Sequence, residues 1–323
     1  MPQAMKPPIR LWIYNHPFVG IADQVEFFVA ALKQTGYEVT VGSQPREDAL
    51  NVVIENFSEE GRDTLILFCR STGKKVAVIM TEHLDFKSGQ LLIHGDPLWN
   101  DNDYMDPRVQ VARLRFLFDC TPWIKGFLVL GDLPQLQGFD HMMPSRPVYS
   151  IPFPELELLE SAGEGNQEEV RRDYLFTGIL TGFRSELIKT MESQNISFFY
   201  PGGLVSRSNR NKANKSSKII LNIPQRRRWK WLSLMRIMAA LRDGRATVSL
   251  GTSDDSKIAC CTYQLNISHD NWLEKLGEYA ANWQELYLDA HKNYSIMARN
   301  FEKEVGFPHE LFEVWAITER IGE

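Results

Sequence analysis

The chain has 323 residues, of which 43% are hydrophobic and 24% are charged, and its formal net charge is −5. This length suits about two domains with an apolar core in each, and the acidic balance argues against a nucleic-acid binder, a class that is usually basic. No apolar run approaches the ~20 residues of a membrane-spanning helix, and residues 1–8 lack the apolar core of a signal peptide. We therefore expect a cytoplasmic protein without a transmembrane segment, for which peripheral contact with a membrane stays open.

The first half of the chain alternates between strand-like and helix-like patterns. Asp23 and Glu26 form a capping-box pattern ahead of a helix in which Val25 and Phe28 begin an apolar stripe, and residues 15–22 are expected to be a loop. Strand patterns cover residues 9–14, 37–41, 51–56, 75–80, 126–130 and 148–151, and further helical patterns cover 65–69 and 106–118. Such alternation predicts a parallel, doubly wound sheet.

The second half repeats the alternation after a segment rich in proline, glycine and glutamate, residues 153–172, which we expect to be a linker. Strand patterns cover 173–178, 196–200, 218–223 and 246–250, and helical patterns cover 185–193, 231–242, an apolar stripe from Trp272 to Ala290, and 308–320. We interpret the stripe as core rather than interface. The predicted α/β architecture is a Rossmann-like domain of residues 1–152, a second of residues 173–307, and a final helix in 308–323.

The four cysteines are Cys69, Cys120, Cys260 and Cys261, and no pair of them has the spacing of metal ligands. We interpret them as buried thiols in a reducing compartment.

Charge is distributed unevenly along the chain. Residues 193–242 contain no acidic residue but eleven lysines and arginines. Segregated positive charge suits an anionic ligand, and the alternative is a solvated basic face. Arg226, Arg227 and Arg228 follow the strand pattern 218–223 and precede the next helix. Since helix N-termini meet at the carboxyl edge of a parallel sheet and arginine bonds phosphate with two donors, we expect a phosphorylated ligand at this turn.

A second turn of this kind follows the strand pattern 173–178. Thr177, Gly178, Thr181 and Arg184 supply hydroxyl groups, a small residue and a cation there, and the alternative is a simple tight turn. The turn is our second candidate for holding the same ligand.

In the first half, Glu82, His83 and Asp85 follow the strand pattern 75–80 at the corresponding edge. A histidine flanked by carboxylates can act as a tuned base or proton shuttle, although a lone loop histidine is often structural. Gly20 and Asp23 lie where the first strand meets the first helix, where glycine allows a substrate to approach the backbone and aspartate can alternatively cap the helix.

Several familiar motifs are absent: the sequence has no GxGxxG, GxxxxGK[ST], GxSxG or HExxH. Asp101 and Asp103 form a DxD triplet, a pattern that can hold a divalent ion, but the triplet falls in a polar loop, and a hard cation needs more oxygen ligands. We therefore predict neither a metal site nor a tightly bound cofactor.

The pattern resembles the glycosyltransferases of the GT-B fold. Two stretches carry the resemblance: residues 173–178 through Arg184, and residues 218–223 followed by Ser233, Arg236, residues 239–244 and Val248-Ser249. In the second stretch the family usually reads R-x-F-E-A-L-A-x-G-x-x-V-V-S. Many members have a glutamate there that holds donor hydroxyls, whereas this chain has Ala239, whose methyl group accepts no hydrogen bond.

The resemblance implies two Rossmann-like domains that face each other across a cleft, with the final helix crossing back to the first domain. It implies a nucleotide diphosphate sugar as donor in the second half and, against Gly20 and Asp23 in the first, an acceptor that is a glycan, a lipid-linked glycan or a protein. Metal-independent transfer follows when basic residues stabilise the leaving diphosphate. The donor residues implied are Gly178, Thr181, Arg184, Arg226, Arg227, Arg228, Ser233 and Arg236.

The hypothesis from the sequence is a glycosyltransferase with His83, Glu82 and Asp85 as catalytic residues. The main alternative, motivated by Ala239, is a catalytically degenerate binding protein of the same fold. A scaffold whose basic face meets an acidic protein or membrane, and a different sugar-nucleotide enzyme such as an epimerase, also stay open.

Overall fold

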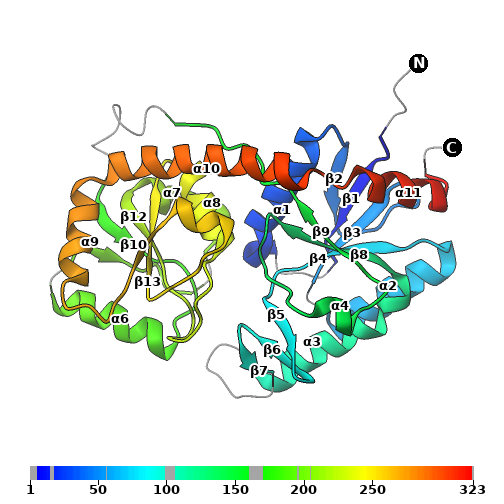
Figure 1. Ribbon diagram of the computed structural model, residues 1–323, viewed down its shortest axis with the longest axis horizontal. Helices are drawn as coiled ribbons and strands as arrows, with labels where there is room; N and C mark the ends of the chain where they lie inside the picture. Colours follow the sequence, from blue (N-terminus) through cyan, green and yellow to red (C-terminus); the bar gives the residue numbers. More distant parts are fainter. Residues whose placement is uncertain are drawn as a thin grey trace. The chain divides into compact units, whose positions relative to one another are not determined.

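A computed structural model describes residues 6–14, 18–55, 57–98, 106–159, 170–194, 196–203 and 205–321. The chain forms two compact units (Figure 1). Unit 1 comprises Met1–Pro154 together with Phe301–Glu323, and unit 2 comprises Glu155–Asn300.

Unit 1 is built on a six-stranded sheet in which every pairing is parallel. The strand order is β2-β1-β3-β4-β8-β9. The strands are β1 (Ile9–Trp12), β2 (Val39–Gly42), β3 (Leu50–Ile54), β4 (Val76–Ile79), β8 (Ile124–Leu130) and β9 (Val148–Ile151). All residues of β3 and β4 are buried, as expected for central strands that are covered on both faces.

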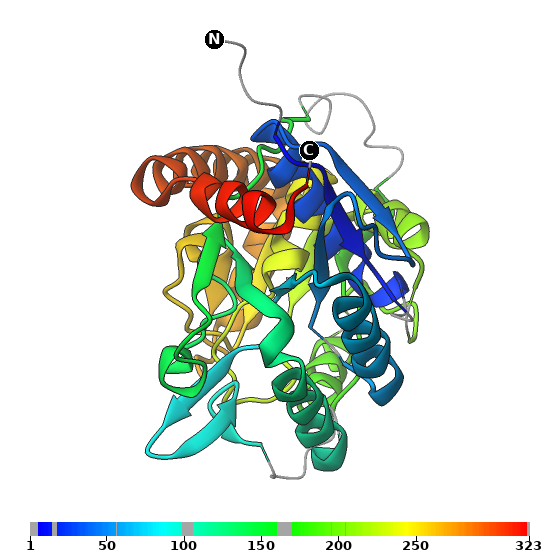
Figure 2. The same cartoon turned by 90° about the vertical axis from the view of Figure 1, so that its right-hand side faces the viewer.

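Helices cover both faces of this sheet. Val76 and Val78 of β4 pack into one core with Leu65 of α2 (Glu59–Thr72) and Leu114 of α3 (Pro107–Asp119). The helices α2 and α3 lie side by side in Figure 2. On the other face, α1 (Phe18–Gln34) contacts β9, and α11 (His309–Glu319) contacts β3.

The predicted loop at residues 15–22 is wrong from Phe18 onward, because α1 begins there. Ile21 and Ala22 are buried with Val25 and Phe28 and extend the same apolar stripe by one turn. Asp23 therefore lies inside the helix rather than at its cap. Residues 15–17 lie outside the described part of the chain.

A small antiparallel sheet, which the sequence did not predict, follows β4. It consists of β5 (Leu84–Lys87), β6 (Gln90–Ile93) and β7 (Asp96–Pro97). The two turns are Ser88-Gly89 and His94-Gly95, and all four residues have positive φ. Two-residue turns with positive φ at both positions match the twist of a hairpin. A short helix α4 (Phe139–Met142) follows β8.

Unit 2 repeats the architecture with a five-stranded parallel sheet of order β11-β10-β12-β13-β14. The strands are β10 (Arg172–Leu175), β11 (Phe198–Phe199), β12 (Ser217–Asn222), β13 (Ala246–Leu250) and β14 (Tyr263–Leu265). One face packs on α6 (Gly182–Ser193) and α9 (Trp272–Ala281), and on the other Ala240 of α8 (Leu234–Arg242) packs on Leu175 and Ile220.

The apolar stripe from Trp272 to Ala290 is divided between two helices. α9 ends at Ala281, and α10 (Trp283–Val305) begins after Asn282. Trp272, Trp283 and Tyr287 are buried within the described chain, so the stripe is core. A further helix, α7 (Arg207–Lys215), lies in the basic stretch, where polar residues gave no apolar period.

Two parallel α/β sheets, one in each unit, confirm the predicted fold class. Three cysteines are buried as expected, whereas Cys260 is exposed. Across the described ranges, no helix has the length and apolar character needed to span a bilayer. In the same ranges, no three His, Cys, Asp or Glu side chains gather into a group that could hold a metal ion. Asp101 and Asp103 lie outside them.

Candidate functional site

The two sheets share one topological feature. In each, the first strand of the unit lies between the second and third, so the chain reverses its direction of winding between β1 and β3 and again between β10 and β12. Open α/β sheets bind ligands at such switch points, beyond the carboxyl ends of the strands. These two places are therefore the candidate sites.

The switch point of unit 1 opens into a cavity of about 610 Å³. Its walls include five large apolar or aromatic side chains: Trp12 and Tyr14 at and just after the end of β1, Phe57 after β3, Leu65 of α2 and Phe116 of α3. Trp12 is fixed by a hydrogen bond from its Nε1 to the Ser43 carbonyl, at 3.1 Å. A cavity with these walls and a few polar groups has the size and character of a small-molecule site.

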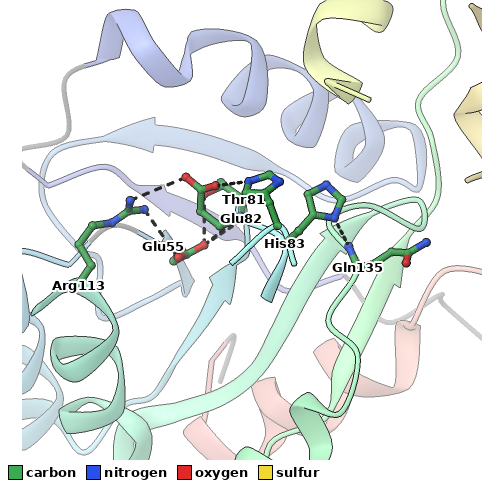
Figure 3. Close-up of polar contacts among 7 residues, drawn as sticks. Glu55, Thr81, Glu82, His83, Arg113 and Gln135 are labelled. Carbon is green, nitrogen blue, oxygen red and sulfur yellow. Dashed lines mark hydrogen bonds and ion pairs between the residues drawn. The ribbon is translucent and has the colours of Figure 1, made fainter. Parts of the chain in front are cut away.

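Next to the cavity, two glutamates meet beyond the ends of β3 and β4 (Figure 3). Glu55 is only 4% exposed. Its Oε2 accepts hydrogen bonds from the backbone N–H groups of Thr81 at 3.0 Å and Glu82 at 3.3 Å. The hydroxyl of Thr81 donates to the same oxygen at 3.3 Å. The loop after β4 is thus built around the Glu55 carboxyl.

Arg113 of α3 lines the cavity and connects both glutamates to it. Its guanidinium lies 3.7 Å from Glu55 Oε1 and 3.8 Å from Glu82 Oε1. The Nε2 of His94, on the second hairpin turn, lies 3.0 Å from Glu82 Oε2. We call Glu55, Glu82, His94 and Arg113 the carboxylate cluster.

The two carboxyl groups of the cluster are tuned in opposite directions. Burial, together with the neighbouring Glu82, raises the pKa of Glu55 and outweighs the opposing effect of Arg113. Burial also disfavours ionisation of Glu82, but the hydrogen bond and charge of His94, with Arg113, lower the pKa of Glu82 overall. Two neighbouring acids whose pKa values diverge can hold one proton and one negative charge at the same pH.

His83 packs against one member of this cluster, because its ring centroid lies 4.9 Å from that of His94, and Asp85 follows on β5. The Nδ1 of His83 accepts a hydrogen bond from the Gln135 backbone N–H at 3.1 Å, which fixes the ring against the loop after β8 (Figure 3). Asp85 lies in β5, paired with Leu92. Of the three predicted catalytic residues, the structure brings Glu82 into the cluster.

Gly20 and Asp23 lie in the first two turns of α1. Gly20 is exposed, with no atom within 4 Å of the position that a Cβ would take, and Asp23 is buried. Neither residue lines the cavity of unit 1.

At the switch point of unit 2, Arg236 joins the ends of the two strands. Its Nη1 donates to Asn222 Oδ1 at 3.1 Å, and its Nη2 donates to the Thr177 carbonyl at 2.7 Å. Gly178, at φ +142°, leaves room for the guanidinium. A cation is thus held between β10 and β12, with part of its surface exposed.

Arg184, at the start of α6, stabilises the loop after β10 by bonding backbone carbonyls. It is buried and donates to the Ile223 carbonyl from Nε at 3.0 Å and from Nη2 at 2.7 Å, and to the Ile179 carbonyl from Nη1 at 2.8 Å. Thr181 donates to the Gln225 carbonyl at 2.6 Å. Arg184 and Thr181 thus fix the loops that follow β10 and β12. Both residues lie at the carboxyl edge of the sheet of unit 2, where Arg184 adds a positive charge.

The arginine run lies on the surface after β12. Arg227 and Arg228 are exposed and Arg226 is half-buried. Arg227 pairs with Glu186 of α6 at 2.8 Å. Ser233 is exposed at the N-cap of α8. The run and the helix N-terminus therefore flank the same carboxyl edge as Arg236.

Ala239 is only 2% exposed, in the middle of α8. A longer acidic side chain in its place would have to leave this packed environment or displace its neighbours. The glutamate that the predicted resemblance leads us to expect at this position would therefore not fit the packing of α8.

The sequence did not single out Glu55, Arg113, His94 or Asn222. Glu55 is the second-last residue of the strand pattern 51–56, so the strand-end argument applied to Glu82 would have found it. Asn222 has the same place in the pattern 218–223. Arg113 is one arginine among several on a helix, and the antiparallel insertion that carries His94 was not predicted.

No protein-family model and no curated protein sequence matches the chain. A comparison with solved structures finds several whose backbones superpose on most of this chain at low sequence identity. An α,α-trehalose-phosphate synthase (UDP-forming) from Burkholderia vietnamiensis has a TM-score of 0.46 and 9% identity, covering 85% of this chain and 75% of that one. AviGT4, a glycosyltransferase involved in avilamycin A biosynthesis, has a TM-score of 0.44 and 10% identity, covering 97% of both chains. An α1,3-fucosyltransferase has a TM-score of 0.40 and 11% identity, covering 90% and 83%.

All three TM-scores lie below 0.5, so the resemblance to the GT-B fold stays a prediction. What the structure itself shows is an α/β chain with one parallel sheet in each unit.

Proposed function

We propose that the protein is a glycosyltransferase that moves a sugar from a nucleotide diphosphate sugar to an acceptor hydroxyl. The observation that carries the proposal is the position of Arg236, held between Thr177 and Asn222 at the switch point of unit 2. A fixed, partly exposed cation at the carboxyl edge of a parallel sheet, beside helix N-termini, suits a diphosphate. Arg184, Gly178, Thr181, Ser233 and the run Arg226–Arg228 complete the proposed donor site.

In the proposed reaction, the acceptor oxygen forms a bond to the anomeric carbon of the sugar. The bond between that carbon and the phosphate oxygen breaks, and its electron pair stays on the diphosphate. Arg236 and the arginine run stabilise the charge that develops there. The acceptor's proton passes to a carboxylate, for which Glu82 is our candidate because His94 and Arg113 keep it ionised, as a general base must be. We assign His83 and Asp85 to positioning Glu82: His83 packs against the ring of His94, which contacts Glu82, and Asp85 lies on β5, which pairs with the strand before His94.

Thermal unfolding against UDP, GDP, dTDP, ADP and CDP tests the donor assignment. A ligand that binds only the native state adds about 2.7 kcal/mol at a hundredfold excess over its dissociation constant. We expect one nucleoside diphosphate to raise the unfolding temperature, Arg236→Met to abolish this rise, and Arg299→Met to retain it. Arg299 is a suitable control because it is exposed on α10 and bonds its own helix. If no nucleotide shifts unfolding at millimolar concentration, the donor assignment fails.

The second candidate is a catalytically degenerate binding protein, favoured by the buried methyl group of Ala239. It predicts the same nucleotide-dependent stabilisation without release of nucleoside diphosphate from any nucleotide sugar. Measuring that release, in the presence of candidate acceptors, separates the two functions. Cytoplasmic location, metal independence and the lack of a nucleic-acid partner remain predictions.

A further inference from the structure

The cavity of unit 1 contrasts in chemistry with the switch point of unit 2. Its inner wall is made by buried side chains that include Trp12, Phe57 and Leu65, with Phe116 half-buried beside them. These residues come from β1, the segment after β3, α2 and α3, so the cavity is built by several elements of one unit. A surface of this kind gains free energy by removing apolar groups from water.

The charged residues at the cavity are already paired. Arg113 faces Glu55 and Glu82 at 3.7 and 3.8 Å. At the mouth, Arg108 pairs with Asp106 at 2.9 Å. A charged ligand would have to compete with these partners and lose its own hydration. The electrostatics of the cavity therefore favour an uncharged ligand.

We infer that this cavity binds an uncharged, mainly aromatic small molecule that carries a hydroxyl group. Its volume of about 610 Å³ falls within the range of drug-sized sites. The aromatic walls suit a fused ring system, and the polar side chains of Tyr14 and Ser58, which line the cavity, provide partners for a hydroxyl. That this molecule is the sugar acceptor rests on the proposed function, whereas its binding does not.

The test is calorimetric titration of the full chain with 2-naphthol and with 2-naphthalenesulfonate, in the absence of nucleotide. We expect 2-naphthol to bind and the sulfonate, which has the same rings and a negative charge, to bind about tenfold more weakly or not at all. Tighter binding of the sulfonate would overturn the inference, because it would mean that Arg113 is available to an anion.

Two variants locate the binding. Ala112→Trp places a large ring into the cavity that Ala112 lines, and Val109→Arg places a charge at its mouth, where Val109 is 50% exposed. Val305→Arg is the matched control, since Val305 is 49% exposed on α10 and does not line the cavity. We expect the first two to weaken 2-naphthol binding about tenfold or more and the control to leave it unchanged. Equal binding by all three variants overturns the inference.

The outcomes also separate this inference from the proposed function. Binding of 2-naphthol without any nucleotide-dependent stabilisation would support the cavity and contradict the glycosyltransferase. Stabilisation by a nucleoside diphosphate without 2-naphthol binding would contradict the cavity alone. If both hold, mass spectrometry of the reaction with the matching nucleotide sugar should detect the 2-naphthyl glycoside.

Discussion

The guanidinium of Arg236 occupies the space beside Gly178 that a side chain would need. A Cβ at Gly178 would lie 3.2 Å from Arg236 Nη2 and 3.4 Å from the ring of Phe176. The backbone there has φ +142°, which L side chains rarely adopt. The glycine and the arginine therefore depend on each other: the first provides the room, and the second bridges the strand ends.

Gly178→Ala should lower both the free energy of unfolding and the affinity for nucleoside diphosphate. Backbone strain of this kind costs about 1–3 kcal/mol, and displacement of Arg236 adds the loss of affinity. Gly73→Ala is the control, because Gly73 has φ +72° with no atom within 4 Å of its Cβ position, and it lies in unit 1. It should lose stability alone. Equal nucleotide affinity in both variants would show that the Gly178 turn does not hold the ligand.

The free energy of unfolding of the Glu55→Gln variant, relative to that of the unmodified protein, should increase as the pH rises. The pKa of Glu55 is raised in the folded state, so the folded protein holds a proton that the unfolded chain releases. This contribution is present below the usual glutamate pKa and is lost as the pH rises through the folded pKa, by about 1.4 kcal/mol per unit of separation. Glutamine does not ionise and can accept the bonds from Thr81 and Glu82.

Urea unfolding at a series of pH values from about 4 to 8 measures this effect, since the series spans the ordinary pKa of a glutamate side chain and neutral pH. The stability of Glu55→Gln relative to the unmodified protein should increase across the series. Glu47→Gln, at an exposed position of unit 1, should show no such trend. A difference that stays constant with pH would mean that burial does not keep Glu55 protonated.

Replacing Arg226, Arg227 and Arg228 together by glutamine should weaken nucleoside diphosphate binding and reduce its dependence on salt. The unfolding temperature should change little, because exposed pairs such as Arg227 with Glu186 contribute about 0–1 kcal/mol. The control is the double variant Lys212→Gln/Lys215→Gln. These lysines are exposed in the same basic stretch, but at the end of α7, before β12 begins. Equal affinity in the triple and double variants would remove the arginine run from the donor site.

Elements whose signal is local were predictable from the sequence. β8 and β13 are apolar runs bounded by turns. β13 has the predicted bounds, and β8 begins two residues before the predicted 126–130. The start of α1 was missed because the capping pattern at Asp23 outweighed the apolar residues before it. The small sheet was missed although its two turns contain glycine, at Ser88-Gly89 and His94-Gly95. β5 and β6 have four residues each and β7 has two, which is too short for a clear alternation of apolar and polar residues.

The residues of the two candidate sites could be predicted only in part, because a single sequence shows where strands end but not which distant segments come into contact. The strand-end argument located Glu82 and Gly178, because the ends of parallel strands are readable from the chain. It did not reveal that Arg113 lies against Glu55 and Glu82, since Arg113 follows both glutamates by more than thirty residues in the chain. It also did not reveal that Arg184 is buried on backbone carbonyls, which only the turn after β12 brings within reach.

The cysteines differ sharply in their availability to reagents. Cys69, Cys120 and Cys261 are buried, and burial raises the pKa of Cys69 and Cys120 to about 12, so these thiols stay protonated at neutral pH. Cys260 is exposed at the end of the 3₁₀ helix Lys257–Cys261, between β13 and β14. A maleimide fluorophore added to the unaltered protein would therefore attach at one position of unit 2, where its emission can report ligand binding without any engineered cysteine.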